Sequence, residues 1–187
     1  MREILPGILM MKRTLGSNVY LMVDHGAFLV DAGFPLDTRR LEKRLLEWGA
    51  PTLMVATHCH LDHMGSMAAL KRTFGSPVAA HEADADVMEG KKPYRMFKLD
   101  PLRTAYYKLA SPLYRYKYVS VDMRLKGGEC LGGGGELRVI HLPGHTEGSI
   151  ALYHEKRGIV FSGDTVRNER GVLEGPPEKF TPDLETS

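Results

Sequence analysis

The most constraining feature of this sequence is a cluster of potential metal ligands at residues 57–63, which read Thr-His-Cys-His-Leu-Asp-His. Neutral imidazole is the commonest metal ligand in proteins, and carboxylates bind the same divalent ions. An apolar run at 51–57, typical of a short buried strand, precedes the cluster, and a helical pattern at 64–74 follows it. A structural zinc site is often richer in cysteine than this cluster, which has only Cys59. The sequence therefore predicts a catalytic metal site on a strand-to-helix loop, where a rigid scaffold can direct several side chains to one point.

The flanking sequence predicts an α/β fold, because strand and helix patterns alternate in the first half of the chain and strand patterns dominate the second. Apolar runs joined by Asp-His-Gly predict a β-hairpin near the start. The expected elements are this hairpin (18–23 and 27–30), a helix at 36–48, a strand at 77–80, a helix at 81–87, a strand at 136–142 and a second hairpin (149–153 and 158–161).

Four segments carry a resemblance to a known family. Residues 58–63, His-x-His-x-Asp-His, resemble the HxHxDH signature of the metallo-β-lactamase superfamily. Residues 142–149, Leu-Pro-Gly-His-Thr-Glu-Gly-Ser, resemble its PGHT-x-GS segment, and residues 161–165, Phe-Ser-Gly-Asp-Thr, resemble its SGD-T segment. Residues 30–33, Val-Asp-Ala-Gly, resemble an early family segment, so the resemblance covers most of the chain. It implies a four-layer αβ/βα sandwich with the metal site at one edge, between the two sheets.

The resemblance assigns six side chains to two metal ions. His58, His60 and His145 would hold the first ion, Asp62 and His63 would hold the second, and Asp164 would bridge the two. These nitrogen and oxygen ligands suit Zn²⁺, although Fe and Mn accept similar sites. Asp62 is also the expected catalytic residue, since it can orient a hydroxide held by the metals and accept its proton. His145 and Asp164 follow predicted strands, as the 57–63 cluster does, so the ligands are expected to meet at strand ends.

The resemblance implies a hydrolase that uses a metal-bound hydroxide on a small ester, thioester, lactone or related bond. The main alternative is a mononuclear iron oxygenase acting on a persulfide, since residues 57–63 also resemble that branch. A Gly-Cys-Gly-Arg-like segment follows the bridging aspartate in that branch and in glyoxalase II, whereas residues 165–171 read Thr-Val-Arg-Asn-Glu-Arg-Gly here. A nucleic-acid-processing enzyme and a non-enzymatic metal-binding module are further alternatives, and the intact ligand set argues against the second.

Residues 91–118 differ in composition from the rest of the chain. They contain eight lysines or arginines, one acid and six of the eight tyrosines. One interpretation is an amphipathic helical insert that packs its tyrosines on the domain. Another is a lid over the metal cleft that binds an anionic small-molecule substrate through its basic side chains. Interleaved basic and aromatic residues could also bind nucleic acid, which is the less favoured interpretation.

The composition is that of an ordinary globular chain, which we expect to form a single domain over residues 1–187. Its hydrophobic fraction is 43%, its charged fraction is 26% and its net charge is +2, so nothing in the overall charge favours a nucleic-acid or membrane partner. No apolar run reaches the length of roughly 18 residues that a spanning helix needs. The two cysteines, Cys59 and Cys130, offer no disulfide framework, which is typical of a cytoplasmic protein.

One ligand of the family pattern has no counterpart in the sequence. The family pattern ends with a further histidine some tens of residues after the bridging aspartate, whereas no histidine follows His154 here. We therefore expect the natural polypeptide to be longer, with a C-terminal helix, a strand and the final ligand of the second ion. Without that ligand, the second ion should bind more weakly than the first.

Overall fold

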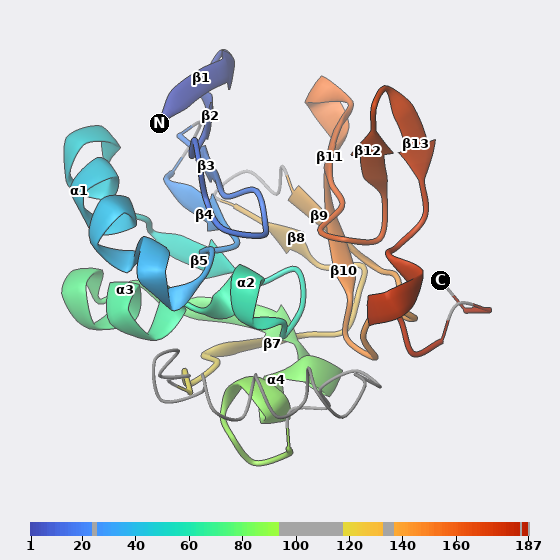
Figure 1. Cartoon of the computed structure of the whole chain (residues 1–187). Helices are drawn as coiled ribbons and strands as arrows, with labels where there is room; N and C mark the ends of the chain where they lie inside the picture. Colours follow the sequence, from blue (N-terminus) through green and yellow to red (C-terminus); the bar gives the residue numbers. More distant parts are fainter. Residues whose placement is uncertain (24–25, 94–117, 133–136, 184, 187) are drawn as a thin grey trace.

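A computed structural model describes residues 1–23, 26–93, 118–132, 137–183 and 185–186 (Figure 1). The larger sheet has seven strands in sequence order. Its first four strands are antiparallel, and β4 to β7 are parallel. These strands are β1 (Arg2–Leu5), β2 (Ile8–Met10), β3 (Tyr20–Met22), β4 (Phe28–Val30), β5 (Leu53–Val55), β6 (Val78–His81) and β7 (Met123–Leu125).

Helices connect the parallel strands, as the alternating pattern predicts. α1 (Thr38–Trp48) lies between β4 and β5, and α2 (Leu61–Met64) and α3 (Met67–Phe74) lie between β5 and β6. α4 (Glu82–Met88) follows β6 directly. Figure 1 shows α1 and α3 together on one face of the larger sheet, while the second sheet lies on the other side.

The second sheet is antiparallel and has the strand order β11-β10-β9-β8. Its strands are β8 (Cys130–Leu131), β9 (Leu137–His141), β10 (Ile150–His154) and β11 (Ile159–Phe161), with the short turn η2 (Glu155–Arg157) between the last two. A separate hairpin of β12 (Arg167–Glu169) and β13 (Val172–Glu174) stands beside β11 in Figure 1, and the 3-10 turn η3 (Glu178–Phe180) follows it.

The central strands of the larger sheet bury both faces, as parallel strands covered on two sides require. In β4, Leu29 packs into the cluster shared with α1 and α3, while Phe28 and Val30 pack into the cluster between the sheets. In β5, Met54 and Val55 divide in the same way. One face of the larger sheet therefore packs on the helices and the other packs on the smaller sheet. The expected αβ/βα sandwich is confirmed.

The predicted helix at 64–74 is divided in two. The backbone of Gly65 passes close to Pro35, such that a Cβ at position 65 would lie 2.5 Å from the Pro35 Cδ atom. The Ser66 hydroxyl also donates to the Phe34 carbonyl at 2.7 Å. These contacts with a distant part of the chain separate α2 from α3, which the local periodicity does not reveal.

The predicted helix at 36–48 begins later than expected. A 3-10 turn, η1 (Pro35–Asp37), precedes it, and α1 starts at Thr38. The buried carboxylate of Asp37 accepts the backbone N–H groups of Phe34 and Leu15, both at 3.1 Å. Asp37 thus holds the turn and a distant loop, and does not belong to the first turn of the helix.

Most of the expected insert, residues 94–117, lies outside the described residues. Its described ends are residues 91–93 and Tyr118. In the described part of the chain, no helix has both the length and the apolar character needed to span a bilayer.

Candidate metal centre

The predicted ligands lie at the edge where strand ends of the two sheets meet. The loop after β5 carries His58 and His60, α2 carries Asp62 and His63, the loop after β9 carries His145, and the loop after β11 carries Asp164. The backbone N–H of Ile150, the first residue of β10, donates to the Thr57 carbonyl at 2.9 Å. This bond joins the smaller sheet to the ligand-bearing loop, so residues far apart in sequence come together.

His58, His60 and His145 form a compact group, which we call the histidine triad. Their ring centroids are 4.5–4.7 Å apart, and each pair of rings is nearly perpendicular, with interplanar angles of 79–82°. Each ring offers a nitrogen such that the three donor atoms lie within 4.8 Å of one another. Three buried donors around one point could hold a single divalent ion.

Asp164 lies between the histidine triad and His63. One of its carboxylate oxygens is 3.2 Å from His63 Nε2, and the other is 3.6 Å from His145 Nε2. His58, His63 and Asp164 form a second group whose donor atoms lie within 4.8 Å of one another. Asp164 thus lies within reach of both groups of donor atoms.

Asp62 lies beside this second group. Its Oδ2 atom is 3.8 Å from His63 Nε2, and its side chain is 28% exposed. Ser17 donates its hydroxyl to the Asp62 carbonyl, and a Cβ at Gly16 would lie 2.5 Å from Asp62 Oδ2. The glycine therefore allows the loop at 16–17 to close over the aspartate. Burial raises the pKa of Asp62, although the positive charge of His63 opposes this.

Hydrogen bonds at Nδ1 orient the rings of His58 and His63. Thr57 Oγ1 is 3.1 Å from His58 Nδ1 and 2.9 and 3.0 Å from the two oxygens of Asp31. The hydroxyl therefore donates to the carboxylate and accepts from His58. Asp31 also lies 2.8 Å from His63 Nδ1. One buried carboxylate thus fixes two imidazoles, directly and through Thr57.

The ring of His145 is oriented by Thr181, which lies 36 residues later in the sequence. His145 Nδ1 is 3.1 Å from Thr181 Oγ1, which donates its own proton to the Pro177 carbonyl at 3.0 Å. The Nε2 atoms of His58 and His145 are buried and have no hydrogen-bond partner among the described residues, whereas the buried Nε2 of His63 faces the Asp164 carboxylate at 3.2 Å. Unpartnered buried nitrogens are costly, so their convergence is the pattern that a metal ion would satisfy.

The charges of the histidines differ in a way that suits two ion positions. Burial lowers the pKa of His58, of His60 to about 2 and of His145 to about 4, so the triad is neutral near pH 7. Burial alone would also lower the pKa of His63, but Asp31 and Asp164 overcome it and raise that pKa well above its usual value. His63 is therefore protonated near pH 7, whereas the three histidines of the triad are neutral.

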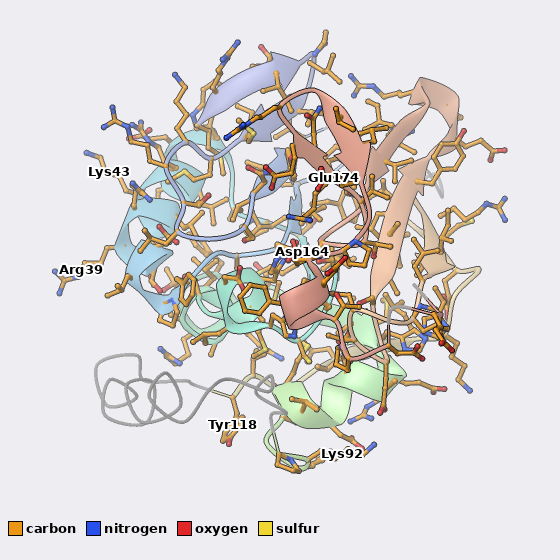
Figure 2. The ribbon with its side chains drawn as sticks, turned by 45° about the vertical axis from the view of Figure 1, so that its right-hand side comes forward. Arg39, Lys43, Lys92, Tyr118, Asp164 and Glu174 are labelled. Carbon is orange, nitrogen blue, oxygen red and sulfur yellow. The ribbon has the colours of Figure 1, made fainter. Side chains whose placement is uncertain are left out.

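Cavities flank the centre on two sides. One, of about 710 Å³, is lined by His63 and Asp164 together with residues of β3, β11 and the β12–β13 hairpin. The other, of about 600 Å³, is lined by His60, His145, residues of α4, and Lys92 at the described edge of the basic insert. Figure 2 shows Asp164 near the middle of the molecule, with Glu174 above it and Lys92 at the lower edge.

Four supporting residues were not identified from the sequence as parts of the site. Asp31 directly follows β4 and Thr57 lies two residues after the neighbouring parallel strand β5, so the acid directly after a buried strand could have indicated a site residue. Thr181 and Asp84 gave no such signal, because their contacts join segments 36 and 62 residues apart.

In the metal-free protein, we expect His58 and His145 to be neutral with the proton on Nδ1, and His63 to be protonated on both nitrogens. Long-range ¹H–¹⁵N NMR spectra of the rings distinguish these states. Thr57→Val should remove the acceptor for His58 and disturb its tautomer, whereas Thr52→Val, at an exposed residue before β5, should not. Neutral Nε2–H tautomers for His58 and His145 in the unaltered protein would contradict the described geometry.

Comparison with known proteins identifies the family of this chain. The sequence profile of the metallo-beta-lactamase superfamily matches residues 13–186. A Bacillus subtilis protein named "Probable metallo-hydrolase YflN" is 28% identical over 196 residues, covering 91% of this chain and 73% of its own. Human acyl-coenzyme A thioesterase MBLAC2 is 33% identical over 121 residues, covering 62% of this chain and 42% of its own.

A solved structure supports the same fold. The HARLDQ-motif metallo-β-lactamase of Cronobacter sakazakii, mutant S60, has a TM-score of 0.67 at 23% identity, covering 85% of this chain and 59% of its own. The chain thus spans less than two thirds of the length of this protein and of the human thioesterase. Because the family profile matches nearly the whole chain, and the two-sheet fold is shared, this chain belongs to the metallo-β-lactamase superfamily.

Proposed function

We propose that this protein is a metal-dependent hydrolase of a small ester, thioester, lactone or related substrate, with Zn²⁺ as the metal. The observation that carries the proposal is the convergence of buried ring nitrogens from His58, His60 and His145, of which the Nε2 atoms of His58 and His145 have no hydrogen-bond partner among the described residues. Neutral imidazole and carboxylate are the ligand types of catalytic zinc sites. The family relationship and the names of two relatives, a metallo-hydrolase and a thioesterase, support the reaction class.

The residues fit two ion positions of unequal strength. The histidine triad would hold the first ion. Asp62 and His63 would hold the second, and Asp164 would contribute one carboxylate oxygen to each position. The first position is buried and already neutral, whereas the second depends on a partly exposed aspartate and on a protonated histidine. We therefore propose that the first ion binds more tightly than the second.

A bound divalent ion supplies Lewis acidity and makes hydroxide available at neutral pH. Asp62 lies at the exposed side of the centre, where its carboxylate can orient the attacking group and accept its proton. Its raised pKa suits this role, because a general base works best when its pKa approaches the operating pH. The cavities beside His63 and beside His60 can receive the two parts of the substrate on either side of the cleaved bond.

The test is hydrolysis by protein stripped with a chelator and reloaded with Zn²⁺, assayed on an acyl thioester, a simple ester and a lactone. We expect activity to be lost with the metal and restored by Zn²⁺. Asp164→Asn should reduce kcat/KM by at least about 100-fold while circular dichroism stays unchanged, since both ion positions lose a charged ligand.

The matched control is Glu169→Gln, which alters another carboxylate lining the same cavity. Glu169 pairs with Arg167 at 3.1 Å and is about half exposed, so its loss should change kcat/KM by no more than a few fold. Hydrolysis that survives chelation, or an Asp164→Asn variant with unaltered activity, would contradict the proposed function.

The two ion positions should respond differently to pH. The triad is neutral near pH 7, so the first ion displaces no proton there. The second ion must displace the proton that His63 retains because of its raised pKa. Between about pH 6 and 8 we expect the affinity of the second ion to increase by up to about tenfold per pH unit, while that of the first changes little. Competition with a chromophoric chelator measures both, and equal pH dependence would count against this assignment.

A further inference from the structure

Asp84 is a buried carboxylate that takes no part in the proposed ligand set. It lies in the first turn of α4, and the residue is only 3% exposed. Its Oδ2 atom accepts the backbone N–H of Cys59 and the hydroxyl of Thr146, both at 2.8 Å. Its Oδ1 atom accepts the backbone N–H of Gly148 at 3.0 Å. Among the described residues, no lysine or arginine forms an ion pair with it, so these donors are what offset its burial.

The space around Asp84 is closely fitted. A Cβ at Gly148 would lie 2.6 Å from Asp84 Cγ and 2.8 Å from its backbone nitrogen. The Thr146 hydroxyl is also 2.9 Å from Ser149 Oγ, which accepts the Thr146 N–H at 2.9 Å. Residues 146–149 therefore form a tight turn that is fastened to the carboxylate at two points.

The partners of Asp84 belong to the two loops that carry the histidine triad. Cys59 lies between His58 and His60, and Thr146 directly follows His145. The first loop leaves β5 of the larger sheet and the second leaves β9 of the smaller sheet. A single carboxylate thus joins ligand loops that come from opposite sheets.

We propose that Asp84 is a positioning residue that holds the histidine triad in its ion-binding geometry before the ion arrives. The inference rests on the metal-binding part of the proposed function. Preorganisation of this kind increases metal affinity, because the ion does not have to draw the two loops together. Asp84 does not act as a ligand itself, since its oxygens already face three donors.

Asp84→Asn tests this role with almost no change in size. The amide keeps only one acceptor oxygen, so its NH₂ group must face either the Cys59 and Thr146 donors or the Gly148 N–H. The first orientation loses the bonds to Cys59 and Thr146, and the second loses the bond to Gly148, so the link between the loops is weakened in either case. We expect the first Zn²⁺ to bind 10- to 100-fold more weakly in chelator competition, and the visible spectrum of bound Co²⁺, which reports ligand geometry, to change.

The matched control is Asp86→Asn, the same substitution two positions further along α4. Asp86 pairs with Arg124 at 3.0 Å and, within the described part of the chain, forms no ion pair with either ligand loop. Its variant should bind Zn²⁺ with wild-type affinity and give the wild-type Co²⁺ spectrum.

Thr146→Val provides a second test should Asp84→Asn fail to fold. It removes one donor to Asp84 and should weaken Zn²⁺ binding by a smaller factor. In the Asp84→Asn background it should have less effect than in the wild type, because both changes weaken the same link between the two loops. Asp84→Asn or Thr146→Val protein that binds Zn²⁺ within about twofold of the Asp86→Asn control, with an unchanged Co²⁺ spectrum, would overturn the inference. Tight Zn²⁺ binding by a wild-type protein that hydrolyses nothing would overturn only the proposed function.

Discussion

The structure depends on keeping imidazole nitrogens turned toward one another in a buried centre. A buried polar atom without a partner costs about 1–3 kcal/mol, and the Nε2 atoms of His58 and His145 meet at this centre without one among the described residues. The fold offsets part of this cost by giving each ring a strong bond at Nδ1, through Thr57, Asp31 or Thr181. These bonds also decide which nitrogen faces the centre. The site is therefore arranged for a ligand that accepts lone pairs, and a divalent cation is the ligand that we propose.

The two sheets are needed because no single segment supplies the whole site. Residues 57–63 follow a strand of the larger sheet, whereas His145 and Asp164 follow strands of the smaller one. The apolar cluster between the sheets sets their separation, and the bond from Ile150 to Thr57 fixes the edge. Under our inference, Asp84 adds a direct link between the ligand loops. Packing in the core thereby determines where the proposed ligand side chains lie at the edge of the sheets.

Much of the site could be predicted from the sequence, because its densest part is local. Residues 58–63 supply three imidazoles within six residues, and the family resemblance adds His145 and Asp164 after later strands. The contacts of Thr181 and Asp84 could not be predicted, since they depend on how distant loops pack. The division of the predicted helix at Gly65 could not be predicted for the same reason, because it results from the close approach of Pro35.

The most direct test of this account is a crystal structure of zinc-loaded protein with anomalous diffraction data collected at the zinc edge. We predict a strong anomalous peak about 2.0–2.1 Å from the Nε2 atoms of His58 and His145 and from one ring nitrogen of His60, and a weaker peak near Asp62, His63 and Asp164. An ion coordinated through the Nδ1 atoms of His58 and His145, or zinc bound only away from these histidines, would contradict the account.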